Sequence, residues 1–432
     1  MDKKKILVFA HYYVPDVASS GQMQAELVEG LMKSFDVTVI TTVPSYEGHI
    51  SDEYKKKNVY WQIINGARII RLRVPEFDKT NKMSRIKNLI AYYFKSKQAI
   101  SLFRHESFDY VFSDSQPPFI GGVLGVYGKK RLRSNTHDRP RFVYNIQDFN
   151  PEQIIAVGYL KNRLLLKVLM AIDKRSCRQS DLIIVPGRDL VDTIKKRFGI
   201  KTSPRTVMIN NWMNENVVFP LSTDNQGVIE FKQEYGLLNK FVIMYSGNLG
   251  LYYDLESLIR VIGSFDGAKT ETGKDVVFAF VGSGSLLNVL KEYAGNNKLS
   301  NVVFIPYQEK SRLVYSINAG DVHWCVNAKG IKGVSCPSKY YGLVAAAKPI
   351  LGVLEEGTEV RMLIEETKGG LVSDPGDFDT IKRNIEWCIT HSVSQELKSM
   401  GERGYAFFLS HLKMSVCIDR FSEEINNLGS EK

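Results

Sequence analysis

The chain has 432 residues, 44% hydrophobic and 24% charged, which is an ordinary balance for a globular protein and enough for two or three domains. No apolar run approaches the roughly 18 residues of a membrane-spanning helix, and the five cysteines lack C-x-x-C spacing, which argues against a zinc site or a disulfide framework. The net charge of +10 is uneven: residues 1–215 hold 35 Lys and Arg against 21 Asp and Glu, and residues 216–432 hold 22 against 26.

The first half of the chain alternates between strand-like and helical patterns. After the basic start Lys3–Lys5, five apolar residues are too few for a signal peptide and predict a buried first strand. Further apolar runs with helical stretches between most of them favour a mostly parallel, doubly wound α/β sheet. The predicted strands are Ile6–Ala10, Val37–Thr41, Ala67–Leu72, Tyr110–Ser113, Arg141–Ile146 and Leu182–Val185.

A basic helix is predicted at 84–104, within a stretch from Lys55 to Arg104 that holds 13 Lys and Arg. Two interpretations stay open: a core-packing helix with a solvated basic rim, or a face that docks on an anionic inner-membrane surface. Nucleic acid is not expected as a partner because no known nucleic-acid module is visible. The residues placed near one helical face are Ile86, Leu89, Ile90, Tyr93, Ile100 and Phe103, flanked by Arg85, Lys87, Lys95, Lys97 and Arg104.

The α/β pattern restarts after the turn-like Asn210-Asn211-Trp212, which predicts a second, similar domain. We expect an N-terminal Rossmann-like domain over 1–210 and a C-terminal one over 211–432, with the last helix a candidate to return to the N-terminal domain. The second set of predicted strands is Phe241–Tyr245, Val276–Val281, Val302–Pro306, Asp321–Val326, Pro349–Val353 and Gly370–Val372.

Two glycine-rich turns follow strands of the second domain. The strand 241–245 runs into Ser246-Gly247-Asn248-Leu249-Gly250, with a helix expected from about Leu255, and Gly282 follows the next strand. Such turns let backbone approach an anionic ligand at the carboxyl edge of a sheet. Each turn alone is also explained as a plain strand-to-helix connection.

The segment 333–350 joins a turn, a helix start at Pro337-Ser338-Lys339 and the small residues Ala345–Ala347. A helix N-terminus presents unpaired N–H groups and a partial positive charge, so with Lys339 it predicts an anion site. An ordinary helix start with a serine cap is the alternative.

In this order the segments resemble the signatures of family 4 glycosyltransferases, and most closely the branch that builds colanic acid, O-antigen and capsule. The resemblance covers nearly the whole chain and implies the GT-B fold, two Rossmann-like domains facing across a cleft. The matching segments are Tyr12–Pro15 with Gly21, Asp148–Glu152, Gly158–Lys161, Asn211-Trp212, Phe219-Pro220, Tyr245–Gly250, Pro337–Lys339, Thr358–Val360 and Gly369–Val372.

The chain departs from the resembled family at its most familiar charged contacts. An Arg and a Lys that grip the diphosphate, a pair of Glu and the His of a His-Asp motif are all replaced. Lys339, the amides of the Gly247 loop and the helix N-terminus are therefore expected to supply most of the anion stabilisation. The replacing residues are Asn248 and Tyr253, then Val334 and Gly342, then Gln147, which leaves Asp148.

The resemblance implies a retaining, hexosyltransferase-type enzyme that uses a nucleotide-diphosphate sugar, with UDP favoured over GDP, and a saccharide acceptor expected to be lipid-linked. The cysteine usage fits a cytoplasmic protein, and the basic stretch predicts that it is peripheral on the inner face of the cell membrane. The alternatives are a sugar-nucleotide epimerase of the same fold and a non-catalytic nucleotide-sugar binding protein. The expected catalytic residues are Asp148 and Lys339; the expected donor contacts are Gly247, Asn248, Gly250, Gly282, Ser338, Lys339 and Glu359, with Gly21 and Asp148 on the acceptor side.

No cofactor and no metal are expected. The single Asp-x-Asp, Asp377-Phe378-Asp379, precedes a helix predicted from about Thr380, so capping explains it better than metal binding.

Overall fold

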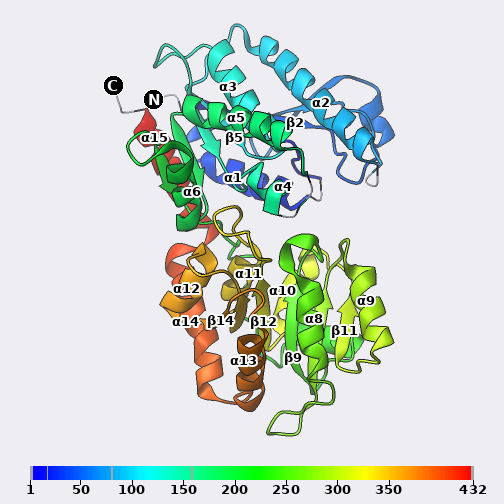
Figure 1. The fold of residues 1–432 in the computed structure, drawn as a ribbon. Coiled ribbons are helices and arrows are strands. Elements are labelled where there is room, and N and C mark those ends of the chain that lie inside the picture. The colour runs from blue at the N-terminus through cyan, green and yellow to red at the C-terminus, as the bar shows by residue number, and fades with distance from the viewer. Residues whose placement is uncertain (1–2, 17, 79–80, 157, 159, 430–432) are drawn as a thin grey trace.

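The computed structural model describes residues 3–16, 18–78, 81–156, 158 and 160–429, which form two α/β lobes, the N-terminal one above the C-terminal one in Figure 1. Tyr159, within one of the segments that carry the family resemblance, lies outside the described residues. The expectation of two Rossmann-like domains facing across a cleft is confirmed, and the sheets below give its detail.

Eight strands form the sheet of the N-terminal lobe, in the order β3-β4-β2-β1-β5-β6-β7-β8. Neighbours pair in parallel except β3 with β4. The antiparallel edge strand β3 and the three-residue β8 were not predicted, since β3 leaves Trp61 and Ile63 exposed and lacks a continuous apolar run. The strands are β1 (Lys4–Phe9), β2 (Phe35–Thr42), β3 (Val59–Ile64), β4 (Ala67–Leu72), β5 (Tyr110–Asp114), β6 (Arg141–Asn145), β7 (Leu182–Val185) and β8 (Thr206–Met208).

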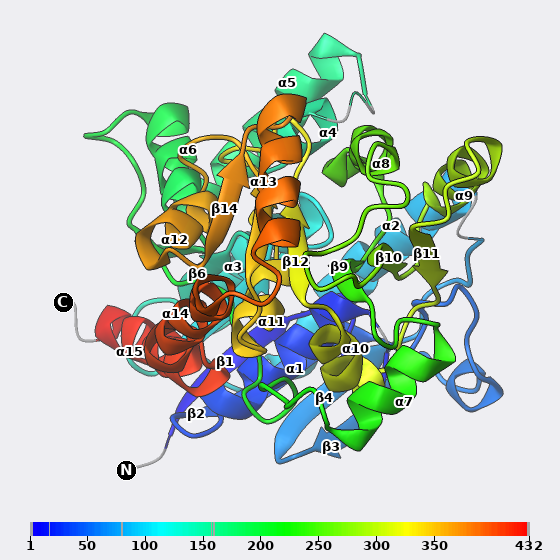
Figure 2. The same cartoon turned by 90° about the horizontal axis from the view of Figure 1, so that it is seen from below.

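Six parallel strands form the C-terminal sheet, in the order β11-β10-β9-β12-β13-β14. Helices cover both faces of it: α8 and α9 lie on one side of β9–β11, and α7 and α10 on the other (Figure 2). The inner strands are buried on both faces and the edge strands β11 and β14 are half-buried, but all six contain continuous apolar runs, which is why the sequence located them. They are β9 (Phe241–Ser246), β10 (Val276–Val281), β11 (Val302–Ile305), β12 (Val322–Val326), β13 (Ile350–Val353) and β14 (Gly370–Ser373).

The helices of the N-terminal lobe are α1 (Ser19–Leu31), α2 (Lys82–Ala99), α3 (Ile120–Arg131), α4 (Glu152–Ala156), α5 (Arg163–Gln179) and α6 (Arg188–Phe198). The later helices are α7 (Gln226–Glu234), α8 (Leu255–Gly263), α9 (Leu287–Asn296), α10 (Leu313–Ala319), α11 (Lys339–Ala345), α12 (Glu359–Thr367), α13 (Phe378–Thr390), α14 (Gln395–His411) and α15 (Met414–Leu428). The 3-10 turns are η1 (Asp52–Lys55), η2 (Ile100–Phe103), η3 (Leu251–Tyr253) and η4 (Lys310–Arg312). The last of the helices, α15, packs on α1, so the chain ends against the N-terminal lobe (Figure 1).

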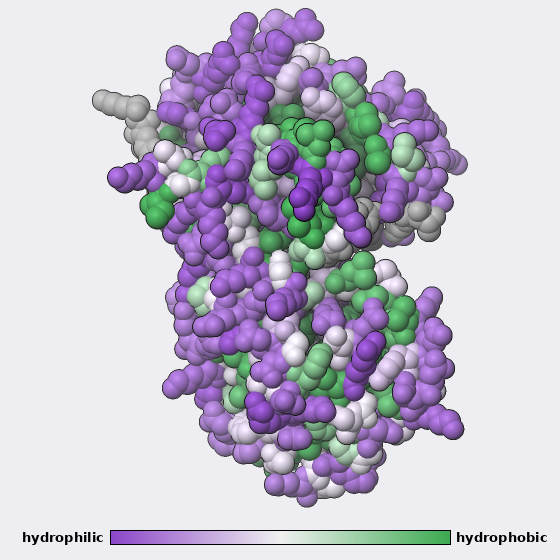
Figure 3. All heavy atoms as spheres, in the orientation of Figure 1, coloured by the Kyte–Doolittle hydropathy of each residue, from purple (hydrophilic) through white to green (hydrophobic). Residues whose placement is uncertain are grey.

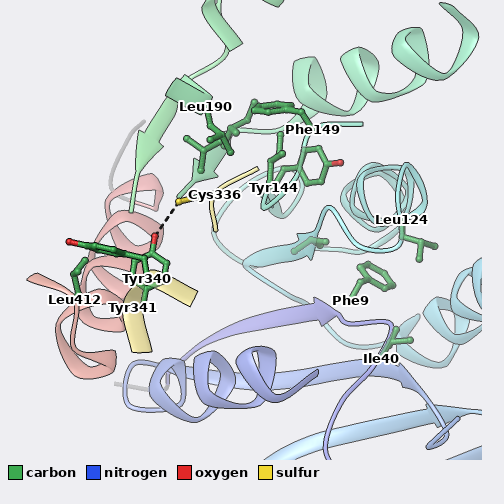
Figure 4. Packing of buried hydrophobic residues seen from close by; sticks show 14 of the residues in the cluster. Phe9, Ile40, Leu124, Tyr144, Phe149, Leu190, Cys336, Tyr340, Tyr341 and Leu412 are labelled. Carbon is green, nitrogen blue, oxygen red and sulfur yellow. Dashed lines mark hydrogen bonds between the residues drawn. The ribbon is translucent and has the colours of Figure 1, made fainter. Parts of the chain in front are cut away.

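A single buried cluster crosses the junction between the lobes. It joins N-terminal residues such as Tyr144 and Phe149 to Cys336, Tyr340 and Tyr341 of the C-terminal lobe (Figure 4). The Cys336 thiol and the Tyr341 hydroxyl lie 3.4 Å apart within it. The segment before α11 is therefore fixed by packing against both lobes.

Helix α2 packs through a different face from the one predicted. Its buried side chains are Asn88, Tyr92, Ser96 and Ala99, spaced along one stripe. Asn88 can face inward because its amide donates to the carbonyl of Pro75 (2.7 Å), a partner that the sequence does not reveal. Of the six residues predicted on one face, Ile100 and Phe103 are buried in the core, whereas Ile86 and Ile90 are exposed. With two neighbours they form a surface row, here called the α2 stripe: Met83, Ile86, Ile90 and Phe94.

Two of the predicted surface lysines of α2 are held by the protein. The Lys95 ammonium donates to the carbonyl of Arg73, and the Lys97 ammonium lies 4.7 Å from the ring centre of Tyr127 and 5.1 Å from that of Tyr93. Lys95 and Lys97 of the basic rim therefore make contacts within the folded protein. Within the described part of the chain, none of the helices is long and apolar enough to cross a membrane.

Candidate functional site

A cavity of about 630 Å³ lies between the lobes, here called the lobe cleft. From the C-terminal sheet it is lined by the residues that follow β9, β10 and β12, and from the N-terminal sheet by those that end or follow β5 and β6. The carboxyl ends of the parallel strands of both sheets thus meet here, which is where ligands bind in open α/β sheets. The cleft contains the expected residues Asp148, Gly247, Asn248, Gly282, Ser338 and Lys339.

The turns after β9 and β10 require glycine. Gly247 and Gly282 have φ of 142° and 139°, conformations that side chains disfavour. A Cβ on Gly282 would lie 2.0 Å from the carbonyl oxygen of Gly247, and a Cβ on Gly247 would lie 2.5 Å from Cε of Lys339. The turns therefore stack directly on each other, and Lys339 passes over bare backbone. Gly250 is buried behind them, where an added Cβ would lie 2.9 Å from Nδ2 of the Asn248 side chain.

Lys339 is the first residue of α11 and extends into the lobe cleft. Its ammonium lies 3.4 Å from the ring centre of Tyr253 and 5.2 Å from that of Tyr245. Among the residues that the structure describes, none forms an ion pair with it. Enclosure at the floor of the cleft, with one side still open, lowers the Lys339 pKa to about 7.

The helix start contributes less than predicted. Helix α11 has only seven residues, and Ser338 at its N-cap is exposed and makes no capping hydrogen bond. Because peptide dipoles add along a helix, so short a helix supplies little field. The anion site therefore depends on the Lys339 side chain and the glycine turns rather than on the helix N-terminus.

Asp148 follows β6 and is held from both lobes. Its carboxylate accepts from Nε2 of Gln116 (3.0 Å), and its backbone bridges to Ser335, while the amide of Phe149 donates to the carbonyl of Val334 (2.8 Å). Burial raises the pKa of Asp148 above its usual value. The position beside the cleft is thus occupied by a carboxylate that packing and hydrogen bonds hold in place.

A second cavity of about 380 Å³, here called the N-terminal cavity, shares Asp148 and Gln116 with the lobe cleft. Asp114, at the end of β5, also lines both cavities and was not identified from the sequence. Its carboxylate accepts from Nε2 of Gln24 (2.6 Å), and burial raises its pKa to about 7. Its place directly after the predicted strand 110–113 was the signal that could have identified it.

Glu359 lies at the domain junction instead of the cleft. Its buried carboxylate accepts from the amide and Nε of Arg188 (2.9 and 2.7 Å) and from Nδ2 of Asn210 (3.1 Å). Beside it, Asp189 accepts from the amide of Gly333 (2.8 Å). Because Arg188 and Asn210 belong to the N-terminal lobe, Glu359 joins the lobes. It does not line the cleft, so its place differs from the expected contact with the sugar-nucleotide donor.

The remaining predicted residues support the site indirectly. Gly21 is buried at the start of α1, where a Cβ would lie 3.1 Å from the backbone of Tyr12, so it brings the first loop onto the helix. Asn211 lines the cleft and donates to Gln147 (2.7 Å). Trp212, which packs in the buried cluster that contains α1, donates to Glu26 (2.9 Å).

The capping interpretation of Asp377 is confirmed. Its carboxylate accepts from the amide (3.1 Å) and the hydroxyl (2.6 Å) of Thr380 at the start of α13. Within the described ranges, the acidic, histidine and cysteine side chains form no group that could hold a metal ion.

The chain is similar in sequence to two curated proteins, whereas no family model matches it. The probable glycosyltransferase WbjE of Pseudomonas aeruginosa is 27% identical over 290 residues, which cover 64% of this chain and 68% of WbjE. The putative colanic acid biosynthesis glycosyl transferase WcaI of Escherichia coli K12 is 24% identical over 378 residues, covering 84% and 87%.

Solved structures show the same fold at low identity. Sucrose-phosphate synthase from Thermosynechococcus elongatus superposes with a TM-score of 0.73 at 11% identity, covering 99% of this chain and 100% of the synthase. Anabaena HepE in complex with UDP-glucose gives 0.65 at 14% identity, covering 98% and 99%. The fold of this chain is therefore GT-B.

Proposed function

We propose that this chain is a glycosyltransferase that transfers a hexosyl unit from a nucleotide-diphosphate sugar to a saccharide acceptor during surface polysaccharide biosynthesis. The observation that carries the proposal is the meeting of the lobe cleft and the N-terminal cavity at Asp148. The lobe cleft offers the Lys339 ammonium and the backbone of the glycine turns, and the N-terminal cavity offers buried polar groups. A charged sugar-nucleotide donor and a neutral acceptor can therefore meet beside the Asp148 carboxylate.

The lobe cleft is the proposed donor site. Among the described residues no carboxylate pairs with Lys339 at the cleft, and the Gly247 and Gly282 turns allow phosphate oxygens to approach backbone. Negative charge builds on the β-phosphate as the sugar leaves, so a cation fixed there stabilises the transition state more than the ground state. UDP is favoured over GDP, which the binding of UDP and UDP-glucose by the structural neighbour HepE supports.

The N-terminal cavity is the proposed acceptor site. Nε2 of His11 and Oε1 of Gln24 are buried there and lack hydrogen-bond partners among the described residues. Buried polar atoms without partners are costly, and saccharide hydroxyls, which both donate and accept, can satisfy them. Asp148 would orient the acceptor hydroxyl toward the anomeric carbon. Retention of anomeric configuration is part of the proposal and is based on the sequence resemblance.

We propose further that the acceptor is lipid-linked and that the N-terminal lobe rests on an anionic membrane surface. Helix α2 supplies a wall of the N-terminal cavity through Arg85 and Leu89, and the α2 stripe is on the same helix. Exposed apolar side chains of α4 and α5 add a second area, visible as hydrophobic surface on the N-terminal lobe (Figure 3). Apolar rows with flanking basic residues suit a bilayer interface. The α4–α5 residues are Ile155, Leu164, Leu165 and Val168.

The first test of the proposed activity is a panel of UDP- and GDP-sugars in a thermal-shift assay. A ligand at 100 times its dissociation constant stabilises a protein by about 2.7 kcal/mol, so a true donor gives a clear shift. The best donor is then incubated with undecaprenyl-diphosphate saccharides, and the anomeric configuration of the product is read by NMR.

Release of nucleoside diphosphate that depends on the acceptor supports a transferase. Interconversion of the sugar nucleotide without any acceptor would identify an epimerase and contradict the proposal. Binding without turnover across the panel would indicate a non-catalytic nucleotide-sugar protein.

A further inference from the structure

We propose that Tyr253 is a positioning residue for Lys339: its ring contacts the ammonium in the lobe cleft and orients it toward the diphosphate. The inference rests on the proposed donor site. It assigns to an aromatic ring, at a place where none of the described acidic side chains forms an ion pair with Lys339, the task of keeping the lysine aimed at the ligand.

The geometry of the contact favours this role over incidental packing. The Lys339 ammonium lies 3.4 Å from the centre of the Tyr253 ring, well inside the roughly 6 Å limit of a cation–π contact. The ring of Tyr245 lies 5.2 Å away and forms a second wall. A lysine side chain rotates about several bonds and would otherwise turn toward water, so the two rings select one orientation of the ammonium.

Each wall is itself fixed. The Tyr245 hydroxyl donates to the carbonyl of Asn248 (2.7 Å), which locks its ring at the end of β9. Tyr253 ends η3 and is followed by Asp254 in a left-handed conformation (φ 46°) that starts α8. Gly247 leaves the gap that Lys339 crosses to reach these rings. The lysine, the two rings and the glycine therefore form one unit built from three separate segments.

The electrostatics of this unit make donor binding depend on pH. The groups that face Lys339 are Tyr245 of β9, Tyr253 of η3 and the Cys325 thiol of β12, with Tyr340 next to it on α11; all four are neutral near pH 7, because burial raises each of their pKa values. Asp148, across the cleft, acts on Tyr253.

With only neutral groups around it, free Lys339 has a pKa of about 7. A bound diphosphate would raise that pKa, because an opposite charge favours the ammonium. Binding above pH 7 must therefore take up a proton, and affinity should fall about tenfold per pH unit until the pKa of the bound state is reached.

The experiment measures UDP binding to the full-length chain by calorimetry from pH 7 to 9, in pairs of buffers with different ionisation enthalpies. For the wild type we expect proton uptake on binding and a steadily weaker affinity as pH rises. Tyr253→Phe keeps the ring and should stay within about twofold of wild type. Tyr253→Leu removes the ring face and should weaken binding at pH 7 about tenfold or more.

Two further variants separate positioning from folding. Tyr293→Leu removes a ring from α9, away from the cleft lining, and should leave UDP affinity unchanged. Lys339→Arg keeps a charge at every pH in this range, so it should bind without proton uptake and with a flat pH profile.

The outcomes distinguish this inference from the proposed function. Absence of UDP and GDP binding by the wild type would overturn both. Equal affinities of Tyr253→Leu and wild type with normal circular dichroism would overturn the role of Tyr253 alone, whereas wild-type binding that is independent of pH would contradict the lowered pKa of Lys339. If Tyr253→Leu fails to fold, Tyr253→Met, which fills much of the same volume without an aromatic face, replaces it: weaker UDP binding supports the role of the ring, and wild-type affinity overturns it.

Discussion

Replacing Gly282 with alanine should damage the protein, whereas the same replacement at Gly295 should strengthen it. Gly282 has φ of 139°, and its Cβ would lie 2.0 Å from the carbonyl oxygen of Gly247. Backbone strain in this region costs about 1–3 kcal/mol, and the Gly247 turn must also move by more than an ångström to relieve the overlap. We expect a loss of about 2–4 kcal/mol of stability.

The control position differs in the two properties that matter. Gly295 is exposed in α9, and a Cβ there meets nothing within 4 Å. Alanine has a higher helix propensity and restricts the unfolded chain, so Gly295→Ala should stabilise by about 0.4–1 kcal/mol. For a domain of this size, 1 kcal/mol shifts Tm by about 2–4 °C.

Thermal unfolding and UDP calorimetry on both variants provide the measurement. Gly282→Ala should melt roughly 4–16 °C lower and lose nucleotide affinity, because the displaced Gly247 turn also borders Lys339. Gly295→Ala should melt slightly higher with affinity unchanged. If Gly282→Ala keeps the wild-type Tm and affinity, the stacked glycine turns do not shape the donor site and the reasoning is refuted.

Four other predictions test the remaining parts of the molecule. Lys339→Ala should weaken UDP binding by roughly 1.5–3 kcal/mol in calorimetry while leaving Tm within about 2 °C, because one charge-assisted contact is lost; unchanged affinity would remove Lys339 from the site. Asp114 has a raised pKa of about 7, so its ionisation destabilises the fold and stability should fall as pH rises from about 4 to 7; Asp114→Asn should flatten that part of the curve in urea titrations. Ile90→Glu with Phe94→Glu should reduce co-sedimentation with anionic vesicles, whereas Val393→Glu, on an even more exposed residue of the C-terminal lobe (66%), should not; equal binding of all three proteins would contradict the membrane proposal. Transfer activity should survive excess EDTA, and a loss that Mn²⁺ restores would contradict metal independence.

The glycine turns and Lys339 could be predicted because their signals are local. Strands buried on both faces give continuous apolar runs, and a glycine directly after such a run marks a turn at the carboxyl edge of the sheet. Lys339 stood out by its place at a helix start.

Long-range partners explain the residues that were misjudged. Glu359 reads as a donor contact, yet its three hydrogen-bond donors come from Arg188 and Asn210, more than 140 residues away. Asn88 reads as a surface residue of α2, yet the carbonyl of Pro75 draws it inward and turns Ile86 and Ile90 outward. A hydrogen bond to a distant group can reverse which face of a helix is buried, and hydrophobic periodicity carries no information about it.

The sequence by itself determined the two α/β domains, most of their strands and several residues that line the lobe cleft. Only the tertiary structure decided that Lys339 lies on the ring of Tyr253, that Asp114 joins Asp148 between the two cavities, and that Glu359 holds the lobes together. The physical reason is that strands and turns follow from interactions between near neighbours, whereas the charge state and orientation of a side chain depend on whichever distant groups the packed chain brings against it.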